Sequence, residues 1–232
     1  MSQQITPDLP NLELRPSVDS LVIEDDTPVD NFFSAKLQRL LVEVLYSSWA
    51  SLGMDRPLVA DADIGIFSSV SRPPIVPDVF VSLDVEAPQD FREKKNRTYF
   101  VWEFGKSPDV VIEIVSNKEG NELGSKLQDY ARLGVTYYVV FDPMGQMGDD
   151  ALQVIGLRVG QYELIEDPWL AQVGLGLTLW EGVFETIEGT WLRWCDRDGK
   201  VLFTGAERAV QAEAKAAKLA EQLRVLGIDP DD

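Results

Sequence analysis

The spacing of apolar residues along the chain predicts a first helix within residues 30–53. Asp30 and Asn31 are typical of a helix start, and Gly53 is typical of a helix end. Between them apolar residues recur at intervals of three and four: Phe33, Leu37, Leu40, Leu41, Val44, Leu45, Trp49 and Leu52. A stripe of this kind indicates a helix that packs one face against a core.

Runs of β-branched and aromatic residues predict buried strands at 63–67, 75–81, 107–116 and 136–141. An amphipathic helix over 122–133 separates the last two, and this strand–helix–strand order indicates a crossover unit in a mixed sheet. Turn residues punctuate the chain between 152 and 203, which indicates antiparallel β-structure. The predicted fold class is α/β, a mixed β-sheet flanked by helices with added antiparallel β-hairpins.

The sequence divides into three parts. Residues 1–29 are rich in Pro, Asp and Ser and read as an extended N-terminal arm, residues 30–205 as the folded domain, and residues 206–232 as a C-terminal helix. One face of that helix suits packing against a partner or a second copy, or docking back on its own domain. Its small and apolar residues are Ala209, Ala212, Ala216, Leu219, Leu223 and Leu226.

Composition excludes several kinds of chemistry. The chain of 232 residues has no histidine and one cysteine, Cys195, which excludes His-based catalysis, His- or Cys-rich zinc sites and an internal disulfide. A bound metal would need oxygen ligands, which favours Mg²⁺, Mn²⁺ or Ca²⁺. We see neither a secretory signal nor an apolar run long enough for a membrane, so we expect a cytoplasmic protein. The net charge of −18 argues against non-specific DNA binding.

Acidic residues interrupt two of the predicted buried strands. Asp109 and Glu113 share one face of the same strand about 13 Å apart, too far to hold one ion by themselves. Asp78 lies within the preceding predicted strand, 75–81, and a hairpin arrangement of the two strands would bring it near Glu113. The pair would then suit one Mg²⁺. Alternatively, both acids cap strand ends or pair with basic residues, and Asp109 forms local hydrogen bonds.

Basic residues suggest how a phosphate could be held. Lys126 and Tyr130 lie four residues apart on one helix face, where Lys126 is either a site residue or an exposed helix lysine, and Lys118 is a competing candidate. The most basic stretch contains Arg92, Lys94, Lys95 and Arg97, with Tyr99 and Trp102 nearby for base stacking. This stretch is either a nucleic-acid-facing rim or a solvated, mobile hairpin tip.

A set of spaced motifs resembles a known family. Residues 102–116, with the sequence WEFGKSPDVVIEIVS, are followed by Lys126-Leu127, Tyr130, Gly134-Val135, Tyr137-Tyr138 and Phe141-Asp142-Pro143. This order is similar to the Uma-two family of restriction-endonuclease-like proteins, which is abundant in cyanobacteria and belongs to the PD-(D/E)XK nuclease superfamily. The resemblance covers roughly residues 30–203 and implies a restriction-endonuclease-like sheet.

The resemblance also implies roles for individual residues. It makes Asp78 and Glu113 the metal carboxylates and the main-chain carbonyl of Ile114 a further ligand, for Mg²⁺ or Mn²⁺. The motif lysine, expected two residues after the second acid, is replaced here by Val115. The resemblance implies that Lys126 takes its place as the third catalytic residue.

Three further residues would support the site from outside it, namely Tyr130, Ser116 and Asp109. The implied function is that of a Mg²⁺-dependent endonuclease, an endodeoxyribonuclease-like hydrolase acting on nucleic acid, with DNA as the expected substrate and no membrane partner. The alternative is a weakly active or inactive nuclease-fold scaffold. In either case we expect a homodimer or a higher homo-oligomer, and in the second the C-terminal helix provides the assembly contact.

Overall fold

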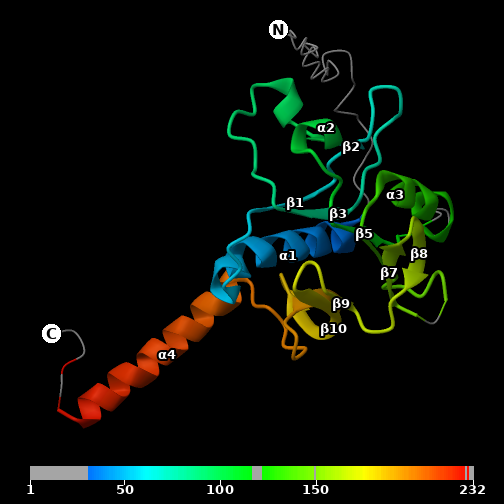
Figure 1. Ribbon diagram of the computed structural model, residues 1–232. Helices are drawn as coiled ribbons and strands as arrows, with labels where there is room; N and C mark the ends of the chain where they lie inside the picture. Colours follow the sequence, from blue (N-terminus) through cyan, green and yellow to red (C-terminus); the bar gives the residue numbers. More distant parts are fainter. Residues whose placement is uncertain (1–30, 117–121, 149, 228, 230–232) are drawn as a thin grey trace, which may run out of the picture.

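The computed structural model describes residues 31–116, 122–148, 150–227 and 229, so the predicted arm of residues 1–29 and Lys118 lie outside the described residues (Figure 1). Its α-helices are α1 (Phe32–Ser48), α2 (Val101–Phe104), α3 (Leu127–Leu133) and α4 (Gly205–Val225). Its strands are β1 (Leu58–Ala62), β2 (Ile66–Phe67), β3 (Val79–Leu83), β4 (Tyr99–Phe100), β5 (Val110–Ile114), β6 (Tyr137–Phe141), β7 (Leu152–Arg158), β8 (Gln161–Leu164), β9 (Trp169–Leu170), β10 (Leu175–Phe184) and β11 (Ile187–Cys195).

A six-stranded mixed sheet organises the fold, in the order β1-β3-β5-β6-β7-β8. Strands β5 and β6 are parallel and are connected through α3, whereas the other neighbours in this sheet are antiparallel. The predicted mixed sheet, its crossover unit and its added antiparallel strands are confirmed. Strands β9, β10 and β11 form a separate antiparallel sheet.

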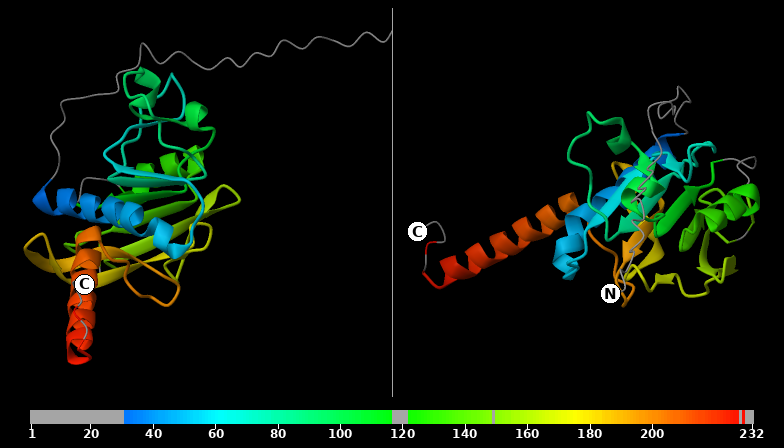
Figure 2. Two further views of the ribbon diagram at one scale, coloured as in Figure 1. Left: turned by 90° about the vertical axis from the view of Figure 1, so that its left-hand side faces the viewer. Right: turned by 45° about the horizontal axis from the view of Figure 1, so that its top comes forward.

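The central strands are buried on both faces, which explains their nearly continuous apolar sequences. Every residue of β3, β5 and β6 is buried. One face packs against α1 and the β9–β11 sheet, and the other packs against α3 and a lobe built from the segments that flank β3, residues 64–76 and 85–104. Figure 2 shows this layering, with α1 and the yellow strands on one side and the cyan-green lobe on the other. The alternation of side chains along each strand therefore assigns every strand residue to one of two cores.

Helix α1 forms where the apolar spacing predicts it. The side chain of Asn31 caps it by accepting a hydrogen bond from the amide of Ser34 at 2.9 Å, and Gly53 ends the following 3₁₀ turn with a φ of 69°. Leu37, Leu40 and Leu41 are fully buried on its inner face. Its buried face also carries three polar residues, Ser34, Gln38 and Ser48, of which Gln38 donates hydrogen bonds to Asp63 and Asp78.

The strand expected at residues 63–67 is confirmed only at its end, Ile66–Phe67, and the main-sheet strand β1 comes before it. The edge strand β1 ends at Ala62, and β2 is a separate two-residue strand that pairs with β4 in the lobe. Asp63 separates them because its φ of 55° lies in the left-handed region, which interrupts an extended chain. The apolar run thus crosses from the sheet into the lobe.

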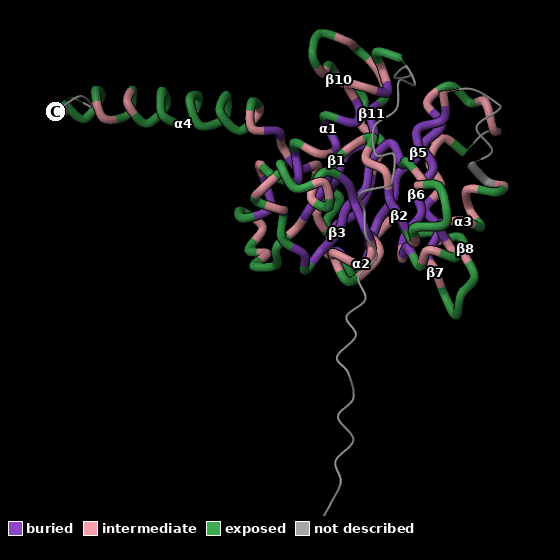
Figure 3. Tube along the Cα trace, turned by 90° about the horizontal axis from the view of Figure 1, so that it is seen from above, coloured by how far each residue is buried: buried purple, intermediate pink, exposed green. Residues whose placement is uncertain are grey.

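Helix α4 projects from the body, as Figures 1 and 3 show. It has no buried residue along its length. Its root is fixed by a capping box between Thr204 and Glu207 and by the buried Arg193, whose guanidinium lies 2.8 Å from the Glu207 carboxylate. The helix thus contacts its own domain through its first turn, whereas the rest of its length does not dock back on the domain as the alternative expects.

Within the described residues, the longest apolar helical segments fall short of what crossing a membrane requires.

Candidate metal-dependent nuclease site

Two carboxylates meet on neighbouring strands at one end of the sheet. Strand β3 is antiparallel to β5 with Val79 opposite Ile112, and continuing this register by one residue places Asp78 opposite Glu113. Residues directly opposite in an antiparallel pair have Cβ atoms about 5 Å apart and point to the same face. The structure therefore brings together the two acids on which the predicted site depends.

Glu113 is held from the side of α3. Its side chain is almost completely buried, and its two oxygens accept hydrogen bonds from the Lys126 ammonium at 2.8 Å and from the Tyr130 hydroxyl at 2.7 Å. Burial and the neighbouring Glu113 carboxylate raise the pKa of Tyr130 well above its usual value, so this hydroxyl keeps its proton and remains a donor. The two contacts fix the orientation of the carboxylate.

Asp78 has a different environment from Glu113. One oxygen accepts a hydrogen bond from the amide of Ile114 at 2.6 Å, and the other accepts one from the Gln38 side chain at 3.2 Å. Burial, and then the charge of Glu113, raise the pKa of Asp78 to about 7 despite these hydrogen bonds. A buried pair of carboxylates with one strongly raised pKa creates a demand for a nearby cation.

Gln38 and Asp63 belong to this arrangement although the sequence analysis does not single them out. The Gln38 amide also donates to Asp63 at 3.1 Å, so one glutamine connects two acids. Gln38 is a polar residue within the buried leucine face of α1, and that exception to the apolar pattern is the signal that could have found it. Asp63 gives no comparable signal in the sequence.

The position of Lys126 depends on an irregular helix start. Residues Glu122–Lys126 form a π-helical turn in which Gly124 has non-helical φ and ψ of −109° and −112°. This turn sets Lys126 at the beginning of α3, with its side chain one-third exposed. Val115, at the position of the standard motif lysine, is buried in the core. The structure therefore places the candidate lysine beside Glu113 from α3.

Asp109 and Ser116 have other contacts. The Asp109 carboxylate accepts hydrogen bonds from the amide of Leu83 at 2.8 Å and from the Lys106 ammonium at 2.6 Å, at the opposite end of β5 from Glu113. The carbonyl of Ser116 accepts a hydrogen bond from the Gln146 side chain at 3.5 Å. The structure thus separates Asp109 from the carboxylate pair.

The basic stretch carries its own counter-charges. Arg92 pairs with Asp90 at 2.9 Å, and Lys95 pairs with Glu93 at 2.8 Å. The Arg97 guanidinium donates to main-chain carbonyls of the same loop. Together with Lys94, these are the residues of the predicted nucleic-acid rim, whose role stays a prediction.

The aromatic residues near this stretch are largely inaccessible from solvent. Tyr99 is 1% exposed and stacks on Phe104, with ring centroids 4.2 Å apart. A base therefore cannot stack on Tyr99 from solvent. Trp102 is half-buried, and its ring packs against Phe100 with a centroid separation of 4.9 Å.

The donor set suits a hard divalent cation. Mg²⁺ is commonly held by one or two carboxylates with water completing an octahedron, and Asp78 and Glu113 offer two carboxylates. The described residues contain no cluster of three or more acidic, His or Cys side chains that could hold a metal. Two carboxylates leave coordination positions for water and a substrate phosphate, and a shared site of this kind fits the residues present.

Comparison with known proteins decides the family. The family model Uma2, described as "Putative restriction endonuclease", matches residues 7–181. The chain belongs to the Uma2 family. The resemblance noted from residues 102–143 is thereby confirmed, as is the restriction-endonuclease-like fold of this Uma2 protein. The matched residues contain all of β3, β5 and α3, and α4 lies beyond them. A search among curated proteins gave no match.

Proposed function

We propose that this Uma2 protein is a nuclease that hydrolyses phosphodiester bonds of DNA with Mg²⁺ or Mn²⁺. The observation that carries the proposal is the placement of Asp78 opposite Glu113, with the Lys126 ammonium 2.8 Å from the Glu113 carboxylate. Two acids and one lysine at one end of a mixed sheet are the residue types that metal-assisted phosphate hydrolysis requires. The family supports a nucleic-acid substrate.

Each residue has a role that follows from its contacts. Asp78, Glu113 and the Ile114 carbonyl would hold the cation, which when bound supplies a Lewis acid at the phosphate. Lys126 is part exposed, so its ammonium reaches a phosphate oxygen and stabilises the negative charge that develops there. Tyr130 holds the Glu113 carboxylate in place by donating to it.

The acidic net charge limits how this protein binds DNA. A net charge of −18 on the protein disfavours contact with the DNA phosphate backbone over a large area of the protein surface. The partly neutralised stretch at residues 90–97 supplies a modest local cationic rim through Arg92, Lys94, Lys95 and Arg97. We therefore expect weak binding that depends on the divalent cation.

Cleavage assays test the proposal. Supercoiled plasmid and a single-stranded oligonucleotide are incubated with the protein in Mg²⁺, in Mn²⁺ and in EDTA, and cleavage is expected only with metal. Glu113→Gln is expected to remove the activity. Glu163→Gln, an exposed position on β8 at the far edge of the sheet, is the matched control. Cleavage by Glu113→Gln at the parent rate would contradict the proposal.

A second proposal concerns assembly, and the exposure of α4 favours it. The helix stands away from the body and has no buried residue. Yet small and apolar residues recur along it and just after its end at alternating intervals of three and four, namely Ala209, Ala212, Ala216, Leu219, Leu223 and Leu226. This heptad spacing is typical of a coiled-coil seam. In a parallel pair, Arg208 of one copy and Glu213 of the other flank the seam with opposite charge. We propose that two copies join through α4.

Molar mass in solution tests this assembly. The full chain is expected at twice its 25.9 kDa by light scattering. Replacing both Leu219 and Leu223 by Glu places charge in the seam and is expected to give the monomer. Val225→Glu, an exposed position outside the seam, is the control and should leave the dimer intact. A monomeric parent, or a dimer that survives the double substitution, would contradict the proposal.

A further inference from the structure

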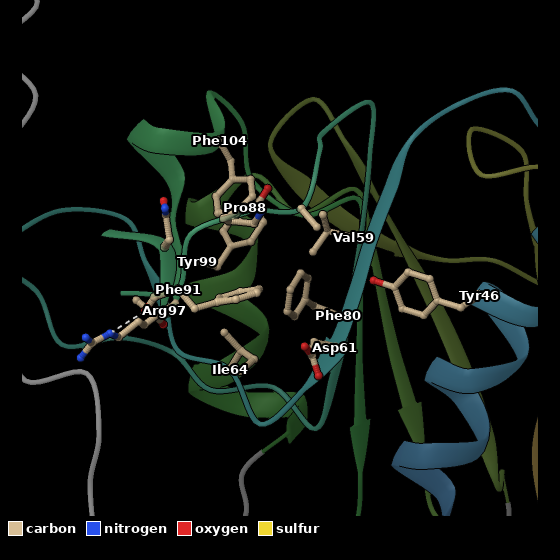
Figure 4. A pocket seen from close by; sticks show the side chains of 13 residues that line it. Tyr46, Val59, Asp61, Ile64, Phe80, Pro88, Phe91, Arg97, Tyr99 and Phe104 are labelled. Atoms are coloured by element: carbon tan, nitrogen blue, oxygen red, sulfur yellow. Dashed lines mark hydrogen bonds between the residues drawn. The ribbon is translucent and has the colours of Figure 1, made fainter. Parts of the chain in front are cut away.

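A cavity of about 250 Å³ opens on the face of the sheet that carries the lobe (Figure 4). Phe80 of β3 and Asp61 of β1 line it from the sheet, and Phe91 lines it from the loop that precedes β4. Pockets for drug-sized ligands span about 300–1,000 Å³. This smaller cavity therefore suits one planar ring system.

The walls of the cavity are aromatic and held in place by one another. Tyr99 contacts Phe80 edge to face, with centroids 5.2 Å apart, and stacks on Phe104 with an angle of 4° between the rings. Phe91 differs, because it is 64% exposed and Figure 4 shows its side chain reaching from the loop toward Phe80. An exposed phenylalanine at the mouth of an aromatic cavity offers a ring face for stacking by a planar ligand.

Asp61 gives the cavity a polar edge. Its carboxylate is exposed, and one of its oxygens accepts a hydrogen bond from the amide of Ala62 at 2.9 Å. A carboxylate accepts a hydrogen bond from the exocyclic amino group of cytosine, whereas thymine has no amino group, and its one donor, the ring N3–H, lies between two carbonyl oxygens that repel a carboxylate. The cavity thus favours amino-bearing bases.

Arg97 steadies the loop that carries Phe91. Its guanidinium donates to the main-chain carbonyls of Phe91 at 3.0 Å and of Arg92 at 2.9 Å. The arginine therefore acts on the loop, which keeps the ring of Phe91 at the cavity mouth.

The register of the sheet places this cavity beside the candidate site. Asp61 is opposite Phe80, and Phe80 lies two residues from Asp78 on the same face of β3. Two strand residues span about 7 Å. A base attached to the nucleotide next to a phosphate held at Asp78 is therefore within reach of the cavity.

We propose that the cavity binds a single unstacked nucleobase that carries an exocyclic amino group. The base stacks on Phe91 and its amino group donates to Asp61. The proposal deepens the nuclease function above and rests on it for the position of the phosphate. It makes single-stranded or locally opened DNA the preferred substrate, because a paired base cannot enter the cavity.

Binding measured without cleavage tests the base pocket. Fluorescein-labelled twelve-nucleotide oligodeoxycytidine and oligodeoxythymidine are titrated with the full chain in Ca²⁺, and anisotropy reports the affinity. Stacking of one base contributes about 1–3 kcal/mol, so Phe91→Ala is expected to weaken oligodeoxycytidine binding about tenfold. Leu164→Ala, equally exposed at the other edge of the sheet, is the control and should bind as the parent does. Asp61→Asn should reduce the preference for cytosine over thymine.

The outcomes separate this proposal from the nuclease function. Equal affinity of the parent for the two oligonucleotides, or an unchanged affinity in Phe91→Ala, would overturn the base pocket even if Mg²⁺-dependent cleavage occurs. Base-dependent binding that is lost in Phe91→Ala would support the pocket even if no cleavage is found, in which case the nuclease proposal alone fails.

Discussion

An ion pair between a carboxylate and a lysine is found at each end of β5, but the two ends differ in the other groups that lie near the carboxylate. Asp109 and Glu113 lie four residues apart on one face of the strand, and each carboxylate has a lysine within hydrogen-bond distance, Lys106 at 2.6 Å and Lys126 at 2.8 Å. At the Asp109 end, the lysine also donates to the carbonyl of Leu83, while the amide of Leu83 donates to the acid. At that end the hydrogen bonds among Asp109, Lys106 and Leu83 satisfy one another and link β3 to the start of β5; we call this arrangement a clamp.

The Glu113 end contains a second acid. Asp78 stands opposite Glu113, and burial together with the charge of Glu113 raises its pKa to about 7. A single buried carboxylate that is paired with a lysine is already satisfied, whereas two facing carboxylates with one lysine leave a deficit of positive charge. An acid in a buried strand of this protein therefore becomes a candidate site residue because a second acid faces it, and not because of its burial alone.

Removing one acid from each end gives the largest expected difference. Asp78→Asn is expected to lower Mg²⁺-dependent cleavage about 1,000-fold or more, because a lost metal ligand removes several kcal/mol of transition-state stabilisation. Asp109→Asn is expected to cleave within a few-fold of the parent, because its contacts are all structural. The initial rate of plasmid nicking, at a protein concentration checked by circular dichroism, measures both. Similar losses in the two variants would break the distinction between the ends of β5.

Part of the candidate site can be predicted from the sequence alone. Asp78 and Glu113 stand out because acids are unusual in buried strands, and Lys126 is selected by the family motif rather than by its local pattern. Their meeting needs the β3–β5 register, which the sequence allows but does not specify.

Other features depend on contacts between segments far apart in the chain. Gln38 reaches Asp78 from α1, forty residues earlier, and no local pattern encodes that contact. The sequence predicts a single strand at 63–67, where the structure has β1 before Asp63 and β2 after it, because the apolar pattern does not reveal the left-handed turn at Asp63. Phe91 is a single aromatic residue in a polar loop, and only the fold shows that it faces a cavity.

The raised pKa of Asp78 predicts a pH-dependent stability, the next largest effect. The unfolded state releases the Asp78 proton near pH 4, whereas the folded state retains it until about pH 7. The folded state therefore binds more protons in this window, so the contribution of Asp78 to stability falls as the pH rises from 4 to 7 and levels off above it. Asp78→Asn cannot ionise and should gain stability relative to the parent over this range, by up to about 4 kcal/mol.

Urea unfolding in EDTA between pH 4.5 and pH 8 measures this difference. Adding Mg²⁺ at pH 8 should stabilise the parent but not Asp78→Asn, since only the parent keeps both carboxylates. If the difference in the free energy of unfolding between the parent and Asp78→Asn stays constant from pH 4.5 to pH 8, then Asp78 ionises as an ordinary exposed aspartate does, and the prediction is wrong.

The two lysines give the finest distinction between the ends of the strand. Lys126→Met is expected to slow cleavage about tenfold, because a cation that stabilises charge on the phosphate is lost. Mn²⁺ should bind this variant as tightly as the parent or more tightly, since the lysine no longer repels the metal or competes for Glu113. Lys106→Met should leave the cleavage rate and the Mn²⁺ affinity unchanged. It should lower the free energy of unfolding by about 1–3 kcal/mol, because Asp109 and the Leu83 carbonyl lose a hydrogen-bond donor. Isothermal titration with Mn²⁺ beside rate measurements separates these effects. If Lys126→Met cleaves normally and is merely less stable, its lysine is a clamp of the same kind as Lys106, and the phosphate must be held by the metal without its help.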